Sequence, residues 1–253
     1  MVAADRKKYI SELLEKNGSV RVSELSQMFN ISEVTVRNYL TDMESMGLLT
    51  RTHGGAISSY KPYCSMNFNQ RLETNHYAKD QIGKKIAEMI EPNDTIMLNS
   101  GTTTLLAFRH FPKDYNLNIV TNSIAIALEA SINSNFNVIL VGGSINTKYQ
   151  YTYGSDAVAQ LKNYHADKLV LSVDGIDLKS GFSTYYNKEA SIDKVMLEQS
   201  DICLVAADET KFRRNAFTKV CDIDKSDYII TDCELRPDEA SHLFDLGINI
   251  INA

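Results

Sequence analysis

The chain of 253 residues is 43% hydrophobic and 23% charged, with a formal net charge of −6 at pH 7. These values are typical of a globular protein with a substantial core, built as one large domain or as a large domain with a smaller one. The acidic balance excludes a protein that attracts nucleic acid through its overall charge. No apolar run approaches the roughly 18 residues of a membrane span, so we expect no membrane partner. The charged residues 5–8 predict that no secretory signal is present.

The four cysteines are scattered along the chain, at Cys64, Cys203, Cys221 and Cys233. They form no CxxC pair and no cluster with histidine at zinc spacing, so the sequence predicts no metal site and no cofactor. Reduced thiols are usual in the cytoplasm, where disulfides are rare. A cytoplasmic protein is therefore expected.

The first 57 residues have the pattern of a small helical domain. Apolar residues recur at helical spacing over three segments, residues 3–17, 23–29 and 33–45. Ser32 is a suitable N-cap for the third helix. Residues 48–57 then form two short runs around Gly54-Gly55, as in a β-hairpin. Residues 1–57 are therefore predicted to form a winged helix-turn-helix domain.

The third predicted helix is suited to the major groove of double-stranded DNA. The first residues of such a helix reach base edges, while its cap and the wing contact phosphates or the minor groove. The first group is Thr35, Arg37 and Asn38, and the second is Ser32, Arg51, Thr52 and His53. A protein-interaction module fits the same helices, because residues 1–57 carry seven basic and seven acidic side chains and are neutral.

Strand and helix patterns alternate from residue 80 to residue 253, after a linker or connector over residues 58–79. The predicted strands cover seven segments, residues 95–98, 119–121, 137–141, 168–173, 202–207, 228–231 and 248–251. Helical patterns lie between most of these segments. Such alternation predicts an α/β domain with a mostly parallel sheet that is covered by helices on both faces.

Polar residues follow several of these strands, at the end of a parallel sheet where ligands bind. Residues 99–104 read Asn-Ser-Gly-Thr-Thr-Thr between an apolar strand and an apolar helix. Hydroxyls, backbone N–H groups and a helix N-terminus around one point favour a phosphate or carboxylate ligand, although an ordinary turn and N-cap has the same composition. The candidate residues are Asn99, Ser100, Gly101, Thr102, Thr103, Thr121, Asn122, Gly142, Gly143, Asp174, Glu189 and Lys211.

Three charged candidates have roles that follow from their chemistry. Lys211 offers a compact cation for a phosphate or a carbonyl oxygen. Asp174 is an acceptor for sugar hydroxyls, and Glu189 is a weaker candidate for the same role. Each also has a structural interpretation: Asp174 precedes Gly175 as a turn residue would, and Lys211 is placed to pair with Asp208.

Motifs in both halves of the chain carry a family resemblance. Residues 32–37 read Ser-Glu-Val-Thr-Val-Arg and residues 51–56 read Arg-Thr-His-Gly-Gly-Ala. The later stretches 99–103, 174–177 and 207–212 (Asn-Ser-Gly-Thr-Thr, Asp-Gly-Ile-Asp and Ala-Asp-Glu-Thr-Lys-Phe) fall in the order of the same family's sensor domain. Over nearly its whole length the chain resembles the DeoR family of bacterial transcriptional regulators.

The resemblance implies a sensor domain similar in fold to ribose-5-phosphate isomerase. Members of the family typically bind a phosphorylated sugar or polyol and then change their affinity for DNA. It therefore implies a regulator, most simply a repressor, of a carbohydrate-utilisation operon, with hexitol and amino-sugar phosphates as the favoured effectors. Repression or activation depends on the position of the operator.

Two departures from the family pattern bear on specificity. The recognition helix usually continues Thr-(Ile/Val)-Arg-Arg-Asp-Leu, and residues 35–40 read Thr-Val-Arg-Asn-Tyr-Leu. A different operator sequence is therefore expected, with Asn38 suited to pairing with adenine. The usual Asp at the head of the Ser-Gly-Thr-Thr loop is replaced by Asn99, which removes one negative charge near the expected effector.

Two other functions fit parts of the pattern. The Asp174-x-x-Asp177 stretch looks like the Asp-Gly-Ala-Asp stretch of ribose-5-phosphate isomerase, and Lys211 and Glu189 would supply an electrophile and an acid–base group. An isomerase, however, has no use for the first domain. The third function is a protein-binding adaptor that never contacts DNA. For a DNA-binding regulator, the neutral first domain predicts a homodimer or homotetramer, because one such domain would bind a half-site weakly.

Overall fold

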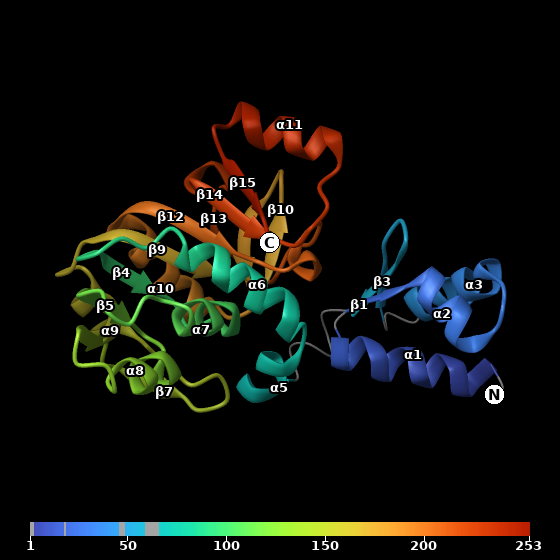
Figure 1. The fold of residues 1–253 in the computed structure, drawn as a ribbon, viewed down its shortest axis with the longest axis horizontal. Helices are drawn as coiled ribbons and strands as arrows, with labels where there is room; N and C mark the ends of the chain where they lie inside the picture. Colours follow the sequence, from blue (N-terminus) through green and yellow to red (C-terminus); the bar gives the residue numbers. More distant parts are fainter. Residues whose placement is uncertain (1–2, 18, 46–48, 59–65) are drawn as a thin grey trace. The chain divides into compact units, whose positions relative to one another are not determined.

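The computed structural model describes residues 3–17, 19–45, 49–58 and 66–253. The chain divides into two compact units, Met1–His76 and Tyr77–Ala253, which are coloured blue to teal and teal to red in Figure 1. Residues 59–65 of the predicted linker, which include Cys64, lie outside the described residues, as does the first residue of the predicted wing, Leu48.

The first unit is a winged helix-turn-helix. Its helices are α1 (Ala3–Asn17), α2 (Val22–Phe29), α3 (Glu33–Ser45) and α5 (Phe68–Glu73), and its strands are β1 (Ser19–Arg21), β2 (Leu49–Arg51) and β3 (Gly55–Ser58). Strand β3 pairs antiparallel with both β1 and β2. The sequence analysis did not predict β1, because three residues are too few to show a period of two.

The helical spacing of apolar residues accounts for the core of the first unit. Helices α1, α2 and α3 each point apolar side chains inward, and the strands add their buried faces. The core residues are Ile10, Leu14, Val20, Val22, Leu25, Val36, Leu40, Met43, Leu49 and Ala56. Because α3 buries this stripe, its opposite face remains available to solvent or to DNA.

The second unit is an α/β domain built on a parallel sheet. The sheet strands are β4 (Thr95–Leu98), β5 (Leu117–Thr121), β6 (Phe136–Leu140), β9 (Ala166–Ser172), β12 (Ser200–Ala206), β14 (Tyr228–Thr231) and β15 (Asn249–Asn252). The helices are α6 (His76–Ala87), α7 (Thr102–Arg109), α8 (Ile124–Ala130), α9 (Ser155–Leu161), α10 (Asn187–Glu198) and α11 (Pro237–Asp245), with 3₁₀ helices η1 (Glu209–Lys211) and η2 (Ile223–Lys225). The predicted fold class is therefore confirmed.

The order of strands in the sheet is β15-β14-β12-β9-β4-β5-β6, and every neighbouring pair is parallel. From β4 the chain moves outward through β5 to β6, then returns to β9 on the other side of β4 and continues outward to β15. Since parallel crossovers are right-handed in almost all proteins, the two opposite directions of travel put α7 and α8 on one face of the sheet and α10 and α11 on the other. The direction of strand order therefore switches between β4 and β9, which is where open α/β sheets bind ligands.

Two smaller sheets were not predicted. Strands β7 (Ser144–Asn146) and β8 (Tyr151–Tyr153) form a hairpin, and β10 (Gly175–Asp177), β11 (Gly181–Thr184) and β13 (Thr218–Cys221) form an antiparallel sheet. Their strands have three or four residues each, too few for a periodic signal. They lie in the connections that follow β6, β9 and β12, beside the carboxyl ends of the main strands.

Helix α6 begins at His76, within the segment that was predicted to be a linker or connector. It packs closely on α7, since a Cβ atom on Gly83 would lie 2.9 Å from the Cα of Ala107. Glycine therefore permits the close approach of the two helices. The early start adds Lys79 to the buried face of α6.

Candidate functional site

The loop after β4 and the end of β9 meet at the switch point of the sheet. Asn99 donates from Nδ2 to the carbonyl oxygen of Ser172 (2.9 Å), and its Oδ1 accepts from the backbone N–H of Ser172 (3.0 Å). A Cβ atom on Gly101 would lie 2.2 Å from the Cβ of Ser172. The sequence analysis explained Gly101 by the close approach of a ligand, whereas in the structure the close neighbour is β9.

A buried lysine lies at the N-terminus of α7. Thr102 is the first residue of α7 after the N-cap Gly101, and its Oγ1 accepts a hydrogen bond of 3.2 Å from the ammonium group of Lys79. Lys79 is 1% exposed and Thr102 is 6% exposed. The sequence analysis missed Lys79, which it placed in the connector. The available signal was its spacing from Ile82 and Ile86, which puts a lysine on an apolar helical face.

Asp208 and Lys211 join the same charge cluster from the end of β12. Asp208 caps η1 and accepts hydrogen bonds from the backbone N–H (3.0 Å) and the hydroxyl of Thr210. Burial by itself raises the pKa of Asp208, but the positive charges of Lys211 and Lys79 outweigh it, so the pKa lies below its usual range. Lys79 and Lys211 are both buried and both act on the carboxylate of Asp208.

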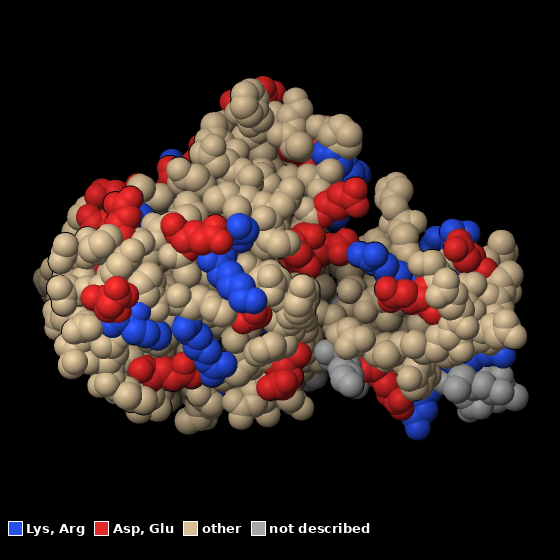
Figure 2. Space-filling model, viewed as in Figure 1, with Lys and Arg blue, Asp and Glu red and all other residues tan. Residues whose placement is uncertain are grey.

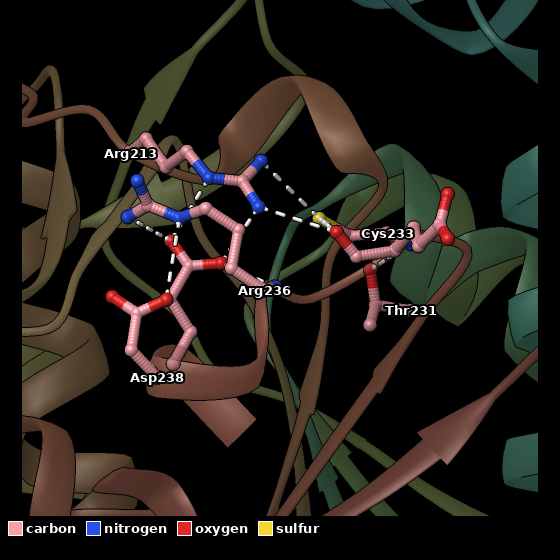
Figure 3. A network of polar contacts seen from close by, with 7 residues as sticks. Arg213, Thr231, Cys233, Arg236 and Asp238 are labelled. Atoms are coloured by element: carbon pink, nitrogen blue, oxygen red, sulfur yellow. Dashed lines mark hydrogen bonds and ion pairs between the residues drawn. The ribbon is translucent and has the colours of Figure 1, made fainter. Parts of the chain in front are cut away.

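A network of ion pairs fixes the segment that carries Lys211 (Figure 3). Arg213 donates to both carboxylate oxygens of Glu239 on α11, at 2.9 and 2.7 Å, and Arg236 donates to the same carboxylate at 2.7 Å. Burial alone raises the pKa of Glu239, but the hydrogen bonds from the two arginines lower it to about 2. Arg213 also donates to the thiol of Cys233 (3.8 Å). The turn after β12 is thus anchored to α11.

Carboxylates gather on the other side of the loop. Ser100 donates to Oε1 of Glu189 (3.3 Å), and the hydroxyl of Thr184 lies 2.7 Å from Oε2 of Glu189 and 3.2 Å from Oδ2 of Asp174. Asp174 also accepts from the backbone N–H of Tyr185 (3.1 Å). The structure therefore brings Asp174, which follows β9, and Glu189, which lies on α10, together with the loop, and adds Thr184 to them.

Asp193 is a buried acid that the sequence analysis did not single out. Its Oδ1 accepts from Nδ2 of Asn99 (3.1 Å), and the residue is 1% exposed. Burial raises the pKa of Asp193 well above its usual range, and the nearby charges of Glu189 and Asp174 raise it further. No signal in the sequence marks this residue, which lies between Ile192 and Lys194 in an ordinary helical pattern.

Thr121 and Asn122 are buried at the end of β5 and make internal hydrogen bonds. The hydroxyl of Thr121 donates to the carbonyl oxygen of Leu98 (2.6 Å) and accepts from the backbone N–H of Ser123 (3.0 Å). Asn122 donates to the carbonyl oxygen of Thr152 (3.2 Å). These bonds serve the fold, and contact of either residue with an effector stays a prediction.

Gly142 and Gly143 follow β6 after Val141, where the chain turns toward the β7–β8 hairpin. The backbone N–H of Gly142 donates to the side-chain oxygen of Gln160 (3.0 Å). Thr103 is buried in the first turn of α7. Effector contacts of these three residues also stay predictions. Among the residues that the structure describes, no three His, Cys, Asp or Glu side chains are grouped so as to hold a metal ion.

The recognition helix of the first unit presents its predicted residues at the surface. Ser32 accepts from the backbone N–H of Thr35 (3.1 Å), as an N-cap should. Arg37 is exposed and forms an ion pair of 2.7 Å with Glu33, one turn earlier. Asn38 is exposed. Val34, in the first turn, is 63% exposed, and an apolar side chain at this place is of the kind that contacts a thymine methyl group.

The wing lies against the recognition helix. The guanidinium group of Arg51 on β2 donates to the hydroxyl of Thr41 (2.7 Å), and its backbone N–H donates to Glu44 (2.8 Å). Thr52 and His53 follow in the turn of the hairpin, and His53 is exposed. On the face of the first unit shown in Figure 2, acidic and basic side chains are interspersed. Local placement of arginines, and not a large basic patch on this face, would therefore determine DNA binding.

Models of two protein families match the chain. The DeoR-like helix-turn-helix domain matches residues 6–61, and the DeoR C terminal sensor domain matches residues 74–233. The chain belongs to the DeoR family. The resemblance found in the sequence is thereby confirmed.

Named relatives of this DeoR-family chain are regulators. A protein provisionally named as an aga operon transcriptional repressor, from Escherichia coli O157:H7, is 32% identical over 98% of this chain and 93% of its own length. The glycerol-3-phosphate regulon repressor of Escherichia coli K12 is 28% identical over 92% of each chain. These names confirm the expectation of a DNA-binding transcriptional regulator, not an enzyme.

A solved structure of ribose 5-phosphate isomerase A from Methanocaldococcus jannaschii is similar to 55% of this DeoR-family chain and 55% of its own, with 14% identity and a TM-score of 0.41. Values this low leave substrate and activity undefined. In the described part of the chain, no helix is both long enough and apolar enough to cross a membrane.

Proposed function

We propose that this DeoR-family chain represses a carbohydrate-utilisation operon and that a phosphorylated sugar or polyol changes its affinity for operator DNA. The observation that carries the proposal is the meeting of two kinds of group at the switch point between β4 and β9. Buried lysines and a helix N-terminus lie on one side of the loop after β4, and hydroxyls and carboxylates lie on the other.

The lysine side is suited to a phosphate. A cation near a helix N-terminus is unfavourable by itself, because the helix dipole is positive at that end. Lys79 is nevertheless buried against Thr102 in the first turn of α7. A bound dianion would be stabilised by Lys79, by Lys211 and by the backbone N–H groups of the turn. Ser100, Gly101, Thr102 and Thr103 would surround it.

The carboxylate side is suited to hydroxyl groups. Asp174 and Glu189 each offer two acceptor oxygens, and Thr184 links them at 3.2 and 2.7 Å. Ser100, which contacts Glu189, is two residues from Thr102, which contacts Lys79. Two residues of chain span at most about 7 Å. The two sides are therefore separated by a distance that one sugar phosphate can bridge.

The relatives support this class of effector. One of them is named for the glycerol-3-phosphate regulon, which is defined by a phosphorylated polyol. Hexitol phosphates and amino-sugar phosphates are the members of the class that we favour for this chain. The remaining candidates Asn99, Thr121, Asn122, Gly142 and Gly143 surround the same strand ends.

The first unit would bind double-stranded operator DNA through α3 and the wing. Thr35, Arg37 and Asn38 would read bases, and Ser32, Arg51, Thr52 and His53 would contact the backbone or the minor groove. Because residues 1–57 are neutral, we expect a homodimer or homotetramer, which would place two such domains on one operator in the cytoplasm. The effector would shift the population between DNA-competent and incompetent states. The segment of residues 58–79, which was predicted as a linker or connector between these functions, contains α5 and the first residues of α6.

The test is fluorescence anisotropy with labelled DNA from upstream of the gene for this chain and of neighbouring genes. Binding is measured at one salt concentration, because phosphate contacts make affinity salt-dependent, and a panel of sugar and polyol phosphates is then added. We expect tight binding that one phosphorylated compound releases. Release by the unphosphorylated sugar, or an equal response to every compound, would contradict the proposal.

A lysine variant distinguishes a role in anion binding from a role in the fold. Lys211→Ala should bind the same DNA normally but need a higher concentration of the releasing compound, by about 10- to 100-fold for one charge-assisted hydrogen bond. The matched control is Lys194→Ala, which removes an exposed lysine from α10 of the same unit. Equal responses of the two variants would exclude Lys211 from the site.

A further inference from the structure

Asn99 and Asp193 form a buried polar contact between the loop after β4 and helix α10. Nδ2 of Asn99 lies 3.1 Å from Oδ1 of Asp193, and each residue is 1% exposed. We call residues 99–104 the effector loop. The contact therefore joins the first residue of the effector loop to a helix on a different connection of the sheet.

The amide of Asn99 uses each of its hydrogen-bonding positions within the protein. One amide hydrogen goes to Asp193 and the other to the carbonyl oxygen of Ser172 (2.9 Å). Its oxygen accepts from the backbone N–H of Ser172 and from the hydroxyl of Thr104, both at 3.0 Å. An amide side chain has two donor hydrogens and two acceptor lone pairs. These four bonds fix one orientation of Asn99.

Helix α10 carries both the partner of Asn99 and the partner of the next residue. Ser100 donates to Glu189 (3.3 Å), and Glu189 lies four residues before Asp193. Residues four apart lie on the same face of a helix. Two consecutive residues of the effector loop therefore contact two consecutive positions on one face of α10. This arrangement determines how far the phosphate side of the site lies from the hydroxyl side.

The acid at position 193 explains the amide at position 99. An aspartate at position 99 would place a second carboxyl group about 3 Å from Asp193, where like charges repel and one of the two must take up a proton. Glu189 and Asp174 already lie near enough to raise the pKa of Asp193. Among the described residues, Oδ2 of Asp193 has no hydrogen-bond partner that would offset a further charge. An amide donates both to Asp193 and to the carbonyl oxygen of Ser172, whereas a carboxyl group has at most one hydrogen to donate and its ionised form repels Asp193.

We propose that Asn99 and Asp193 are positioning residues, a matched amide–carboxyl pair that holds the effector loop against α10 and sets the spacing of the two sides of the effector site. The inference rests on the proposed function, because it assigns the pair a role in that site. It also gives a physical reason for the departure from the family pattern at position 99. Neither residue needs to touch the effector for this role.

The contact is first tested without ligand, by amide hydrogen exchange of the full chain. In Asn99→Asp, peptides from both residues 99–108 and residues 187–198 should exchange at least about tenfold faster, because opening of a segment governs exchange. Asp193→Asn should match the parent, since the amide oxygen that it places at position 193 still accepts from Asn99. Asn116→Asp, the same change at an exposed position, is the control.

The reversed pair, Asn99→Asp with Asp193→Asn, decides whether the effect belongs to the pair. It restores one amide facing one acid, so exchange should return part of the way to the parent rate. Recovery is partial because Ser172 loses its donor from position 99. A double variant no better than Asn99→Asp, or faster exchange confined to the effector loop, would overturn the pairing.

Binding of inorganic phosphate, measured by calorimetry, tests the positioning role. We expect Asn99→Asp to weaken phosphate binding at least about tenfold, and Asp193→Asn to stay within about twofold of the parent. Equal binding by Asn99→Asp and the parent, together with altered exchange, would show a contact that serves stability only and would overturn the positioning role. Absence of phosphate binding by the parent would instead contradict the proposed anion site, while exchange would still report on the pair.

Discussion

The ammonium group of Lys79 lies 3.2 Å from the hydroxyl oxygen of Thr102, with both residues buried. Lys79 comes from the helix that precedes the sheet, and Thr102 begins the helix that follows β4. The contact therefore places a positive charge at the positive end of α7. An anion at this point would interact favourably with both, which makes Lys79 the most informative single residue for a test of the proposed anion site.

Replacement of Lys79 should weaken the effector response without loss of DNA binding. Lys79→Met keeps an unbranched apolar side chain in the buried position and removes the charge. We expect the concentration of phosphorylated effector needed for half-release of DNA to rise about 10- to 100-fold. The exposed Lys84 on the same helix provides the control variant Lys84→Met. An unchanged half-release concentration in Lys79→Met would assign Lys79 to the fold alone.

Arg37 should determine operator specificity. It is exposed on α3 beside its ion-pair partner Glu33, so its removal leaves the core of the first unit intact. Loss of a side chain that contacts a base edge reduces the free energy of DNA binding by about 1–3 kcal/mol. Arg37→Ala should therefore weaken operator binding by about 5- to 150-fold and reduce discrimination against unrelated DNA. Anisotropy with both DNAs measures this. Lys162→Ala, in the second unit, should behave like the parent, and equal operator affinity of Arg37→Ala would disprove the assignment.

Glu239 should make stability depend on pH in the acid range. Its pKa falls from the ordinary 4.5 to about 2 in the folded chain. A lowered pKa stabilises the folded chain at pH values above the ordinary pKa. That stabilisation is lost as the pH falls from about 4.5 to about 2. Glu239→Gln should therefore reduce the free energy of unfolding at pH 7, by at most about 3 kcal/mol, and by progressively less below pH 4.5. Urea unfolding from pH 3 to pH 7 measures this, with the exposed Glu234→Gln as control. A difference that stays constant over this range would contradict the role of the arginine network.

Asp232 should have the opposite effect on stability. Burial raises its pKa from 3.8 to about 6, and the charge of Asp208 adds to the rise. A raised pKa means that the folded chain loses stability as the pH rises through about 6. Asp232→Asn keeps an oxygen that can accept from the backbone N–H of Glu209. We expect its thermal midpoint to match the parent near pH 4 and to exceed it at pH 8; a lower midpoint at pH 8 would show that Asp232 is needed in its charged form.

Local patterns in the sequence were sufficient to predict the main helices and strands. The apolar spacing of Val36, Leu40 and Met43 predicted a helix at α3, and Ser32 predicted its start. The continuous apolar runs of β9 and β12 predicted buried strands of a parallel sheet, because both of their faces are covered by helices. These signals depend only on residues that are close in the chain, and therefore they can be recognised in the sequence alone.

Contacts between distant segments could not be predicted in this way. Lys79 and Thr102 are 23 residues apart, and Asn99 and Asp193 are 94 residues apart. No periodicity links such pairs, and a lysine or aspartate in a helical pattern most often faces solvent. The short strands β10 and β11, which carry the segment with Thr184, were also missed because each has at most four residues.

The sequence by itself determined the two-domain plan, the recognition helix and the position of polar loops after the strands, because helix and strand periods, caps and turns are properties of neighbouring residues. Only the tertiary structure decided which of those polar groups face one another. The order of strands brings the ends of β4 and β9 together at the switch point, and packing of α6 and α10 against them brings in Lys79 and Asp193. Both residues are buried there, and for this reason we assign them to the proposed site.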